Sequence, residues 1–515
     1  YQVIGGTRPG SESAFGITNG VANVGLFFVP PLNCKTPSSV NNIPDVSQIG
    51  NEIFGGVMTI VSEAGAEITI NGSPISNYAA FPQLVQSNPL YESYTIEGLI
   101  GDISIESTAQ VYVATFGAYD YATFGGYYSG FEFKPEILLD NLDNEGLNCI
   151  PNLTLSLSSI STYDEYQWFY NGDPIVGANS PDYTPIDPGY YQISGLIENC
   201  DGSLLSNNIP VSDCPKDYDN DGINDNIDID NDNDGITDCD ESLGDQNLTL
   251  DLAGGNLDNI GNYSINLSYL PQSPEESGWI ADDGGFSTNV PLAYIDENAE
   301  KSPGQTISQV TFDSEVSLEF YFDISNGGSV MNDEQWYSIV VPFDKTITLL
   351  DPNDELRIDS NFDGIFESGI TEISNFNIRF KASDENLTTG SFKFKTHLTN
   401  YFEFQNYNNS LTDSGGVSFK IKATCIPKDS DLDGIVDARD YDSDNDGIPD
   451  LIESQGNNFS SLSGIDVNRD GYDDIFSENF IAFDFDNDNI PDYLDIDSDN
   501  DGIYDLHESG ALNVV

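Results

Sequence analysis

Six short segments of the sequence repeat one arrangement of carboxylates, and that arrangement suits a metal ion bound by oxygen atoms. Each segment has Asp or Glu at positions 1, 3, 5, 9 and 12 of a loop, with Gly or Asn at position 6 and Ile at position 7. Ca²⁺ takes six to eight oxygen ligands at about 2.3–2.6 Å, and a tightly curled chain can aim alternate carboxylates inward. The spacing therefore predicts several bound calcium ions.

The six loops form three tandem pairs, and one residue separates the two loops of each pair. In every loop the backbone carbonyl of the Ile at position 7 is expected to join the carboxylates as a ligand. The ligands expected in the first pair are Asp217, Asp219, Asp221, Ile223, Asp225, Asp228, Asp230, Asp232, Asp234, Ile236, Asp238 and Glu241. Those in the second pair are Asp429, Asp431, Asp433, Ile435, Asp437, Asp440, Asp442, Asp444, Asp446, Ile448, Asp450 and Glu453. Those in the third pair are Asp484, Asp486, Asp488, Ile490, Asp492, Asp495, Asp497, Asp499, Asp501, Ile503, Asp505 and Glu508.

The residue at position 6 has to turn the chain sharply, which explains why all but one of the loops have Gly there. Asn489 is the exception, and Asn is the residue that tolerates a left-handed conformation next best. A run of like charges is usually a solvated, disordered segment. Disorder, however, gives no reason for Gly and Ile to keep a fixed register through six loops. We therefore favour calcium, and we expect the metal-free loops to be loose because their carboxylates repel one another.

EF-hand and dockerin modules use similar loops, but both need an α-helix after each loop, and a gap of one residue leaves no room for it. The pattern instead resembles thrombospondin type 3 repeats. This resemblance implies consecutive short loops that wrap a string of calcium ions with little regular secondary structure.

Two further segments carry the pattern in part. The first has Asp359, Asn361, Asp363, Gly364 and Glu367, and the second has Asp466, Asn468, Asp470, Gly471 and Asp474 but Ser477 at position 12. Each is either a calcium loop or a polar turn capped by Asx side chains.

The composition sets the class of partner and of fold. The 515 residues include 87 acidic and 16 basic side chains, and the net charge of −71 excludes binding of nucleic acid or of an anionic membrane through a basic surface. With 38% hydrophobic and 11% aromatic residues, the chain has enough apolar side chains for packed cores.

No run of about 18 apolar residues occurs, so we expect no transmembrane segment in this chain. The chain starts at Tyr1 without Met or a signal peptide, so we expect a processed product or part of a longer polypeptide.

Short runs in which apolar and polar residues alternate predict an all-β fold. We expect a string of β-sandwich modules joined by the calcium-binding, Asp-rich loops. The expected parts are a β-rich module over 1–145, an immunoglobulin-like β-sandwich over 146–214, calcium-binding repeats over 215–242, a large β-sandwich over 243–426 and calcium-binding repeats over 427–512.

Two of these modules resemble known families. The strand around Trp168, the turn at Asn171 and Gly172 and the later Tyr-rich strand resemble the immunoglobulin-like modules of Bacteroidota surface proteins. The region with the hairpin at Asn71 and Gly72 is similar in part to the N-terminal domain of IgGFc-binding proteins. That similarity implies an adhesive or ligand-binding module.

The six cysteines are isolated in sequence and show no CxxC spacing, which favours extracellular disulfides over a zinc or redox site. Cys239 and Cys425 fall at the two borders of 243–426, so we expect a bridge that clamps the ends of this module. The remaining cysteines allow three pairings that the sequence leaves open, with Cys149 to Cys214 preferred; they are Cys34, Cys149, Cys200 and Cys214.

Other side chains give no sign of catalysis, and we expect a protein that is not an enzyme and has no catalytic residues. His397 and His507 have no triad-like company in the sequence. Trp279 and Trp336 could line a glycan groove, but we expect both in the core. The aromatic run over 115–131 is either a sugar-stacking surface or a hairpin with one buried aromatic face.

The immunoglobulin-like module, the repeated calcium loops and the extreme acidity together resemble the very large gliding-motility adhesins and related surface proteins that Bacteroidota export by type IX secretion. The resemblance implies an extracellular, calcium-stiffened segment attached to the outer membrane and used in surface attachment and gliding. It implies as partners calcium, a polysaccharide or solid surface, and the type IX secretion and motility machinery. The alternative is a secreted carbohydrate-binding or carbohydrate-active multidomain protein, in which 243–426 binds the glycan.

Overall fold

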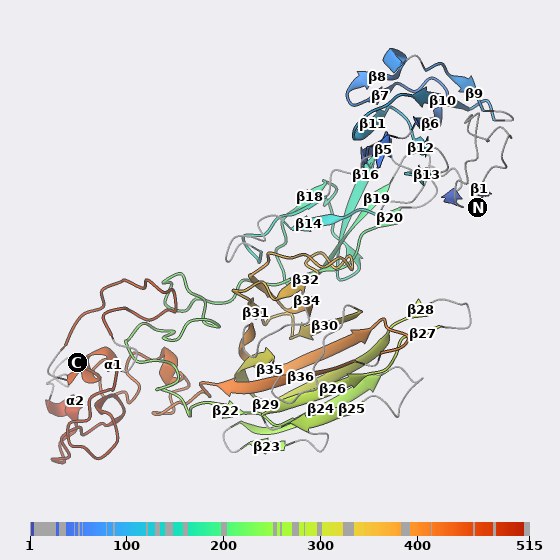
Figure 1. The fold of residues 1–515 in the computed structure, drawn as a ribbon. Coiled ribbons are helices and arrows are strands. Elements are labelled where there is room, and N and C mark those ends of the chain that lie inside the picture. Colours follow the sequence, from blue (N-terminus) through green and yellow to red (C-terminus); the bar gives the residue numbers. More distant parts are fainter. Residues whose placement is uncertain are drawn as a thin grey trace. The chain divides into compact units, whose positions relative to one another are not determined.

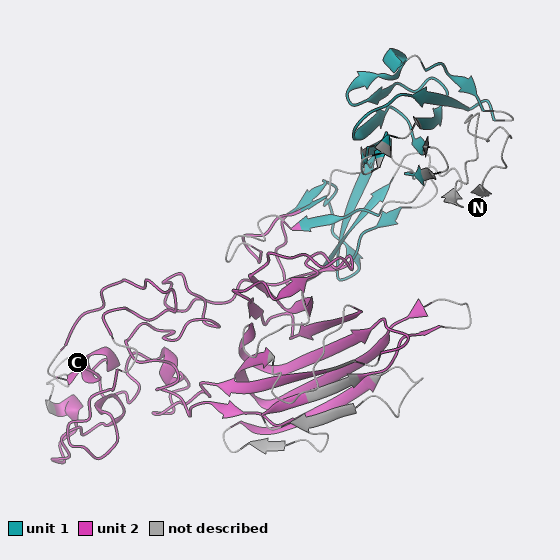
Figure 2. Cartoon of the chain, in the orientation of Figure 1, with its two compact units in different colours: residues 1–138, 156–183, 191–207 teal, residues 139–155, 184–190, 208–515 magenta. Residues whose placement is uncertain are grey.

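The computed structural model divides the chain into two compact units whose regular structure is almost wholly β-strand (Figures 1 and 2). Unit 1 consists of residues 1–138, 156–183 and 191–207, and unit 2 of residues 139–155, 184–190 and 208–515. The prediction of an all-β fold is confirmed. The structure describes residues 2–4, 27–29, 38–45, 47–49, 52–53, 55–78, 80–85, 88–119, 122–128, 134–139, 148–157, 163–196, 203–250, 255–257, 260–269, 278–282, 284–295, 301–322, 334–382, 392–413, 415–456, 459–476 and 480–508.

Unit 1 begins with two antiparallel sheets that share a small core. One sheet has the order β13-β12-β6-β10-β9, and its strands are β13 (Ala122–Tyr127), β12 (Val111–Tyr119), β6 (Gly55–Glu63), β10 (Tyr91–Glu97) and β9 (Gln83–Leu84). The other has the order β3-β11-β7-β8, with β3 (Ser39–Ile43), β11 (Ile103–Ser107), β7 (Ile68–Ile70) and β8 (Ser73–Pro74). The expected alternation is present, since Met58 and Ile60 are buried while Thr59 between them is partly exposed.

A further sheet of unit 1 has the order β17-β16-β19-β20, formed by β17 (Asp173–Pro174), β16 (Glu165–Tyr170), β19 (Gly189–Leu196) and β20 (Leu204–Leu205). Trp168 on β16 is fully buried, and its indole N–H donates to the carbonyl of Ser180 at 2.9 Å. The ring of Tyr183 on β18 (Asp182–Tyr183) lies 5.7 Å from that of Trp168. The tryptophan singled out in the sequence is therefore a core residue whose one polar atom is satisfied.

Unit 2 is built around one large antiparallel sheet whose main path is β25-β26-β36-β29-β35-β30-β34-β32. These strands are β25 (Gly278–Asp282), β26 (Gly285–Val290), β36 (Gly415–Thr424), β29 (Gly304–Phe322), β35 (Lys393–Asn408), β30 (Gln335–Val340), β34 (Asn377–Ala382) and β32 (Leu356–Ile358). The strands off this path are β22 (Gln246–Asn247), β23 (Gly255–Leu257), β24 (Gly261–Tyr269), β31 (Ile347–Leu350) and β33 (Glu372–Asn375). The core is rich in phenylalanine, and Val316, Leu318 and Phe320 alternate into it as expected.

The shorter elements complete the chain. They are β1 (Gln2–Ile4), β2 (Phe27–Val29), β4 (Gln48–Ile49), β5 (Glu52–Ile53), β14 (Ile137–Leu139), β15 (Leu155–Leu157), β21 (Ile209–Val211), β27 (Tyr294–Ile295), β28 (Lys301–Ser302), the 3₁₀ helices η1 (Ile75–Tyr78), η2 (Asp437–Arg439) and η4 (Asp492–Leu494), and the one-turn helices α1 (Asp450–Glu453) and α2 (Asp505–Glu508). In the described parts of the chain, no helix is long and apolar enough to cross a membrane.

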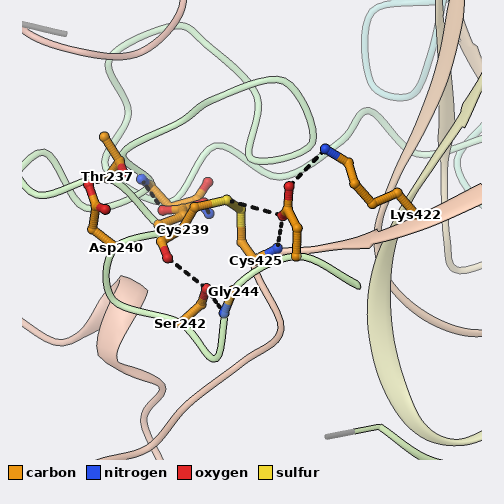
Figure 3. The surroundings of a disulfide bond; sticks show 10 residues. Thr237, Cys239, Asp240, Ser242, Gly244, Lys422 and Cys425 are labelled. Atoms are coloured by element: carbon orange, nitrogen blue, oxygen red, sulfur yellow. Dashed lines mark hydrogen bonds and ion pairs between the residues drawn. A yellow bond between two sulfur atoms is a disulfide. The ribbon is translucent and has the colours of Figure 1, made fainter. Parts of the chain in front are cut away.

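Both disulfides that the sequence favoured are present. Cys149 is bonded to Cys214, and Cys239 to Cys425. Figure 3 shows the second bond, where Asp245 accepts a hydrogen bond from the backbone N–H of Cys425 and pairs with Lys422. Beside it, Gln246 of β22 pairs with Ala423 of β36. The disulfide and the strand pair therefore join the two ends of the segment that forms the large sheet. Cys34 and Cys200 lie outside the described residues.

We expect replacement of both Cys239 and Cys425 by Ala to lower the free energy of unfolding of unit 2 by about 2–4 kcal/mol, because the unfolded chain regains the entropy of a long closed loop. Denaturant unfolding in calcium measures the effect. The matched control is the Cys149→Ala/Cys214→Ala pair, which opens a loop of 65 rather than 186 residues and should cost somewhat less. Unchanged stability of the first variant would contradict the expectation.

Candidate metal centre

The six predicted loops share one set of backbone hydrogen bonds. The N–H of position 6 donates to the carboxylate of position 1, and the N–H of position 7 donates to the carboxylate of position 5. The position 6 donors lie 3.0–3.2 Å from their acceptors and are Gly222, Gly235, Gly434, Gly447, Asn489 and Gly502. The position 7 donors lie 2.7–2.9 Å away and are Ile223, Ile236, Ile435, Ile448, Ile490 and Ile503. The sequence register thus corresponds to one repeated conformation.

The carboxylate of position 9 is held in the same way, by the N–H of position 2 at 2.7–3.1 Å. The acceptors are Asp225, Asp238, Asp437, Asp450, Asp492 and Asp505. The carboxylate at position 12 of the first loop in each pair accepts from the first N–H of the next loop; these are Asp228, Asp440 and Asp495. Position 12 therefore connects the two loops of a pair.

Two positions of each loop have a left-handed backbone. At position 6 the φ angles are 78–102°, as the sharp turn requires. Position 4 has φ of 56–66° in the same six loops, at Asn220, Asn233, Leu432, Asn445, Asn487 and Asn500. The left-handed backbone at position 4 was not predicted from the sequence. Its signal was the frequent Asn, the non-glycine residue best suited to this conformation.

The hydrogen bonds leave the opposite carboxylate oxygens available. In Asp217 and Asp429 at position 1, Oδ2 accepts the backbone bond, while Oδ1 is buried with no partner among the described residues. Carboxylate oxygens of positions 1, 3 and 5 lie within 4.8 Å of one another in at least three loops, among them those of Asp217/Asp219/Asp221, Asp230/Asp232/Asp234 and Asp429/Asp431/Asp433. A cation among them would replace the missing partners.

Most carboxylates at position 3 are also held by the backbone. Asp219, Asp431, Asp444, Asp486 and Asp499 accept the N–H of position 5 at 2.9–3.0 Å. Of the Ile residues at position 7, only Ile236 is buried, while Ile435, Ile490 and Ile503 are exposed. Position 7 therefore contributes mainly through its backbone, and ligation by its carbonyl stays a prediction.

The two partial loops have the same conformation. Gly364 donates to Asp359 at 3.2 Å and Ser360 to Glu367 at 3.2 Å, which are the bonds of positions 6 and 2. In the other loop, Gly471 donates to Asp466 at 2.9 Å and Val467 to Asp474 at 3.1 Å. Position 4 is again left-handed, at Phe362 and Arg469. Ser477, the weak position 12, lies outside the described residues.

The three pairs of loops, called here the first (217–241), second (429–453) and third (484–508) acidic blocks, lie against one another and against the partial loop over 466–474, a contact that the sequence did not predict (Figure 1). The N–H of Ile229 donates to the carbonyl of Asp470 at 3.0 Å, and the hydroxyl of Tyr472 to the carbonyl of Gly235 at 3.1 Å. Arg439 of the second block forms an ion pair with Asp225 of the first and also contacts His397. The loops before and after the large sheet therefore form one acidic assembly.

Burial dominates the electrostatics of this assembly. Burial, with a smaller contribution from neighbouring carboxylates, raises the pKa of Asp228 to about 9 and that of Asp444 and Asp450 to about 8. Burial, followed by the charge of Arg439, lowers the pKa of His397 to about 3, so this imidazole is neutral. Without a cation, the buried carboxylates favour their protonated forms.

The comparisons with known proteins add little. No family model and no curated protein matches the chain. Among solved structures, SGBP-B from a complex xyloglucan utilization locus in Bacteroides uniformis is 10% identical, with a TM-score of 0.14 over 75% of this chain and 97% of that one. The VP2 subviral particle of infectious bursal disease virus is 10% identical, with a TM-score of 0.09 over 77% of this chain and 86% of the other. Likeness at this level carries no argument.

The raised pKa values predict opposite pH effects with and without calcium. A carboxyl group whose pKa rises on folding contributes stability that is present below about pH 4 and is lost as the pH rises through its folded value. Hence the metal-free, dialysed protein should lose thermal stability between about pH 5 and 9. Calcium binding requires deprotonated ligands, so in calcium this loss should disappear or reverse. Pairwise melting curves test this, and a metal-free melting temperature that does not vary with pH would contradict it.

Proposed function

We propose that this chain is an extracellular, calcium-stiffened segment of a cell-surface protein. The observation that carries the proposal is the repeated loop in which backbone N–H groups hold one oxygen of a carboxylate while its second oxygen is buried without a partner. Asp217, Asp429 and Asp497 are examples at position 1. The donor set consists of hard oxygen atoms alone, which suits Ca²⁺ better than a softer metal.

Bound calcium would neutralise the converging carboxylates, and the residues of the chain do the rest. Positions 1, 5 and 9 fix the loop through the backbone, position 3 completes the inward cluster, and position 12 connects the loops of a pair. With the charge neutralised, loops that would otherwise repel can stay packed. The acidic assembly would then be rigid in the calcium concentrations found outside cells.

The location outside the cell is supported by the two disulfides, which persist in oxidising compartments. The adhesive role, export by type IX secretion and attachment at the outer membrane rest on the sequence resemblance to gliding-motility adhesins. A polysaccharide or a solid surface would be the adhesive target, and the secretion and motility machinery the cellular partner.

One local feature favours the carbohydrate-binding alternative. Trp336 is only half-buried, so the expectation that it lies in the core is wrong; its neighbour Tyr337 points into the core instead. The Trp336 ring stacks on Tyr407 at 3.6 Å, and the guanidinium of Arg379 lies 4.7 Å from its centroid. Trp336 and Arg379 border a hollow of about 250 Å³ that is also lined by Phe366, Glu334, Lys381 and Asn409. Aromatic rings beside polar groups are typical of sugar sites.

We expect removal of calcium by EGTA to make 215–242 and 427–508 sensitive to protease, because the loops lose the charge that holds their carboxylates together. Limited proteolysis followed by mass spectrometry locates the cuts. The large sheet, 243–426, is the internal control and should be cut no faster. Digestion that does not change between calcium and EGTA would contradict the proposal.

If the hollow binds a glycan, Trp336→Ala should abolish binding of the full chain on a glycan array, since stacking and the lining of the hollow are lost together. Trp168→Phe serves as a control in a buried core position away from the hollow. Failure of the unmodified chain to bind any glycan would exclude this alternative.

A further inference from the structure

Three carboxylates from two distant parts of the sequence meet inside the acidic assembly. Asp234 and Glu241 belong to the second loop of the first block, and Asp450 to the second loop of the second block, with the whole large sheet between them in sequence. One carboxylate oxygen of each lies within 4.8 Å of the others. All three residues are buried, with exposed fractions of 2%, 1% and 0%.

Two of the three residues offer oxygens without a hydrogen-bond partner among the described residues: Oδ2 of Asp234 and both carboxylate oxygens of Glu241. Neither carboxylate oxygen of Glu241 accepts a hydrogen bond from any described residue, and the same holds for Asp232 beside it. The charged groups that act most strongly on Glu241 are themselves carboxylates, those of Asp234, Asp232, Asp450 and Asp230. A fully buried Glu surrounded by carboxylates is strongly unfavourable unless a cation lies among them.

Asp450 is well placed to reach across because its own loop fixes its orientation. Both of its oxygens lie close to the N–H of Ser443, at 3.0 and 3.2 Å, and its backbone N–H donates to the carbonyl of Tyr441. Its carboxylate therefore approaches Asp234 and Glu241 in one defined position.

We propose that one Ca²⁺ bound by Asp234, Glu241 and Asp450 ties the first acidic block to the second. The inference rests on the proposed calcium binding and goes beyond it. It makes Asp450 a ligand of the ion in the second loop of the first block, in addition to its place in its own loop. Calcium thereby joins the segments before and after the large sheet, in addition to the disulfide between Cys239 and Cys425. Each isolated block would bind its own ions without this tie.

The test compares Asp450→Asn with Asp505→Asn in the full chain. Asp505 occupies the same position in the second loop of its pair and accepts the same kind of hydrogen bond, from the N–H of Ser498 at 3.1 Å, so the control removes an equal charge from an equivalent loop. Hydrogen exchange with mass spectrometry, with and without saturating calcium, reports on each block separately.

In the Asp450→Asn variant, we expect calcium-dependent protection of 229–241 to fall by about tenfold or more, although these residues are far from the substitution in sequence. In the Asp505→Asn control, protection of 229–241 should stay at the level of the unmodified chain. Wild-type protection of 229–241 in Asp450→Asn would overturn the tie while leaving calcium binding intact. If the unmodified chain shows no calcium-dependent protection in any block, the proposed function fails as well.

A second variant guards against a folding defect of the first. In calcium, Glu241→Gln should lower the hydrogen-exchange protection of 442–453. In each of the segments 229–241 and 442–453, the Asp450→Asn/Glu241→Gln double variant should lose no more protection than the single variant with the larger loss, because both side chains bind one ion. Additive losses from the two substitutions would show independent sites and overturn the proposal.

Discussion

The mutual repulsion of buried carboxylates is the constraint on which this structure depends. Two unit charges about 4 Å apart repel by about 4 kcal/mol at an effective dielectric constant near 20. Asp230, Asp232, Asp234 and Glu241 are all buried within one small region. The chain has 16 basic residues for 87 acidic ones, so its own side chains cannot neutralise such clusters. Neutralising these carboxylates therefore requires cations from the surrounding solution.

The loops prepare for that cation with their backbone. Each carboxylate that accepts a backbone N–H is oriented before any ion arrives, which reduces the conformational entropy that binding has to overcome. The same bonds form where the sequence departs from the pattern, as at Phe362 and Arg469, where a side chain poorly suited to a left-handed backbone occupies position 4. The conformation is thus a property of the whole loop rather than of one residue.

The large sheet determines which acidic loops come into contact. Because β22 pairs with β36 and Cys239 is bonded to Cys425, the chain enters and leaves the sheet at one place. The blocks before and after it are therefore brought together, and Arg439 and Tyr472 can contact the first block. A long insertion between the blocks has little influence on their proximity when its two ends are joined.

The sequence alone determined the loops, the roles of their positions 1, 3, 5, 6, 9 and 12 and the all-β fold, because these depend on contacts within a few residues and on alternation along single strands. The bridge between Cys239 and Cys425 was also predictable, since both lie at the borders of one module. Two features were not. Trp336 and Tyr337 are neighbouring aromatic residues, and only packing against Phe380 and Phe404 shows that Tyr337 faces the core. The meeting of Asp450 with Asp234 and Glu241 was likewise decided by tertiary structure, because charge and spacing in one loop carry no information about a loop that the fold places beside it.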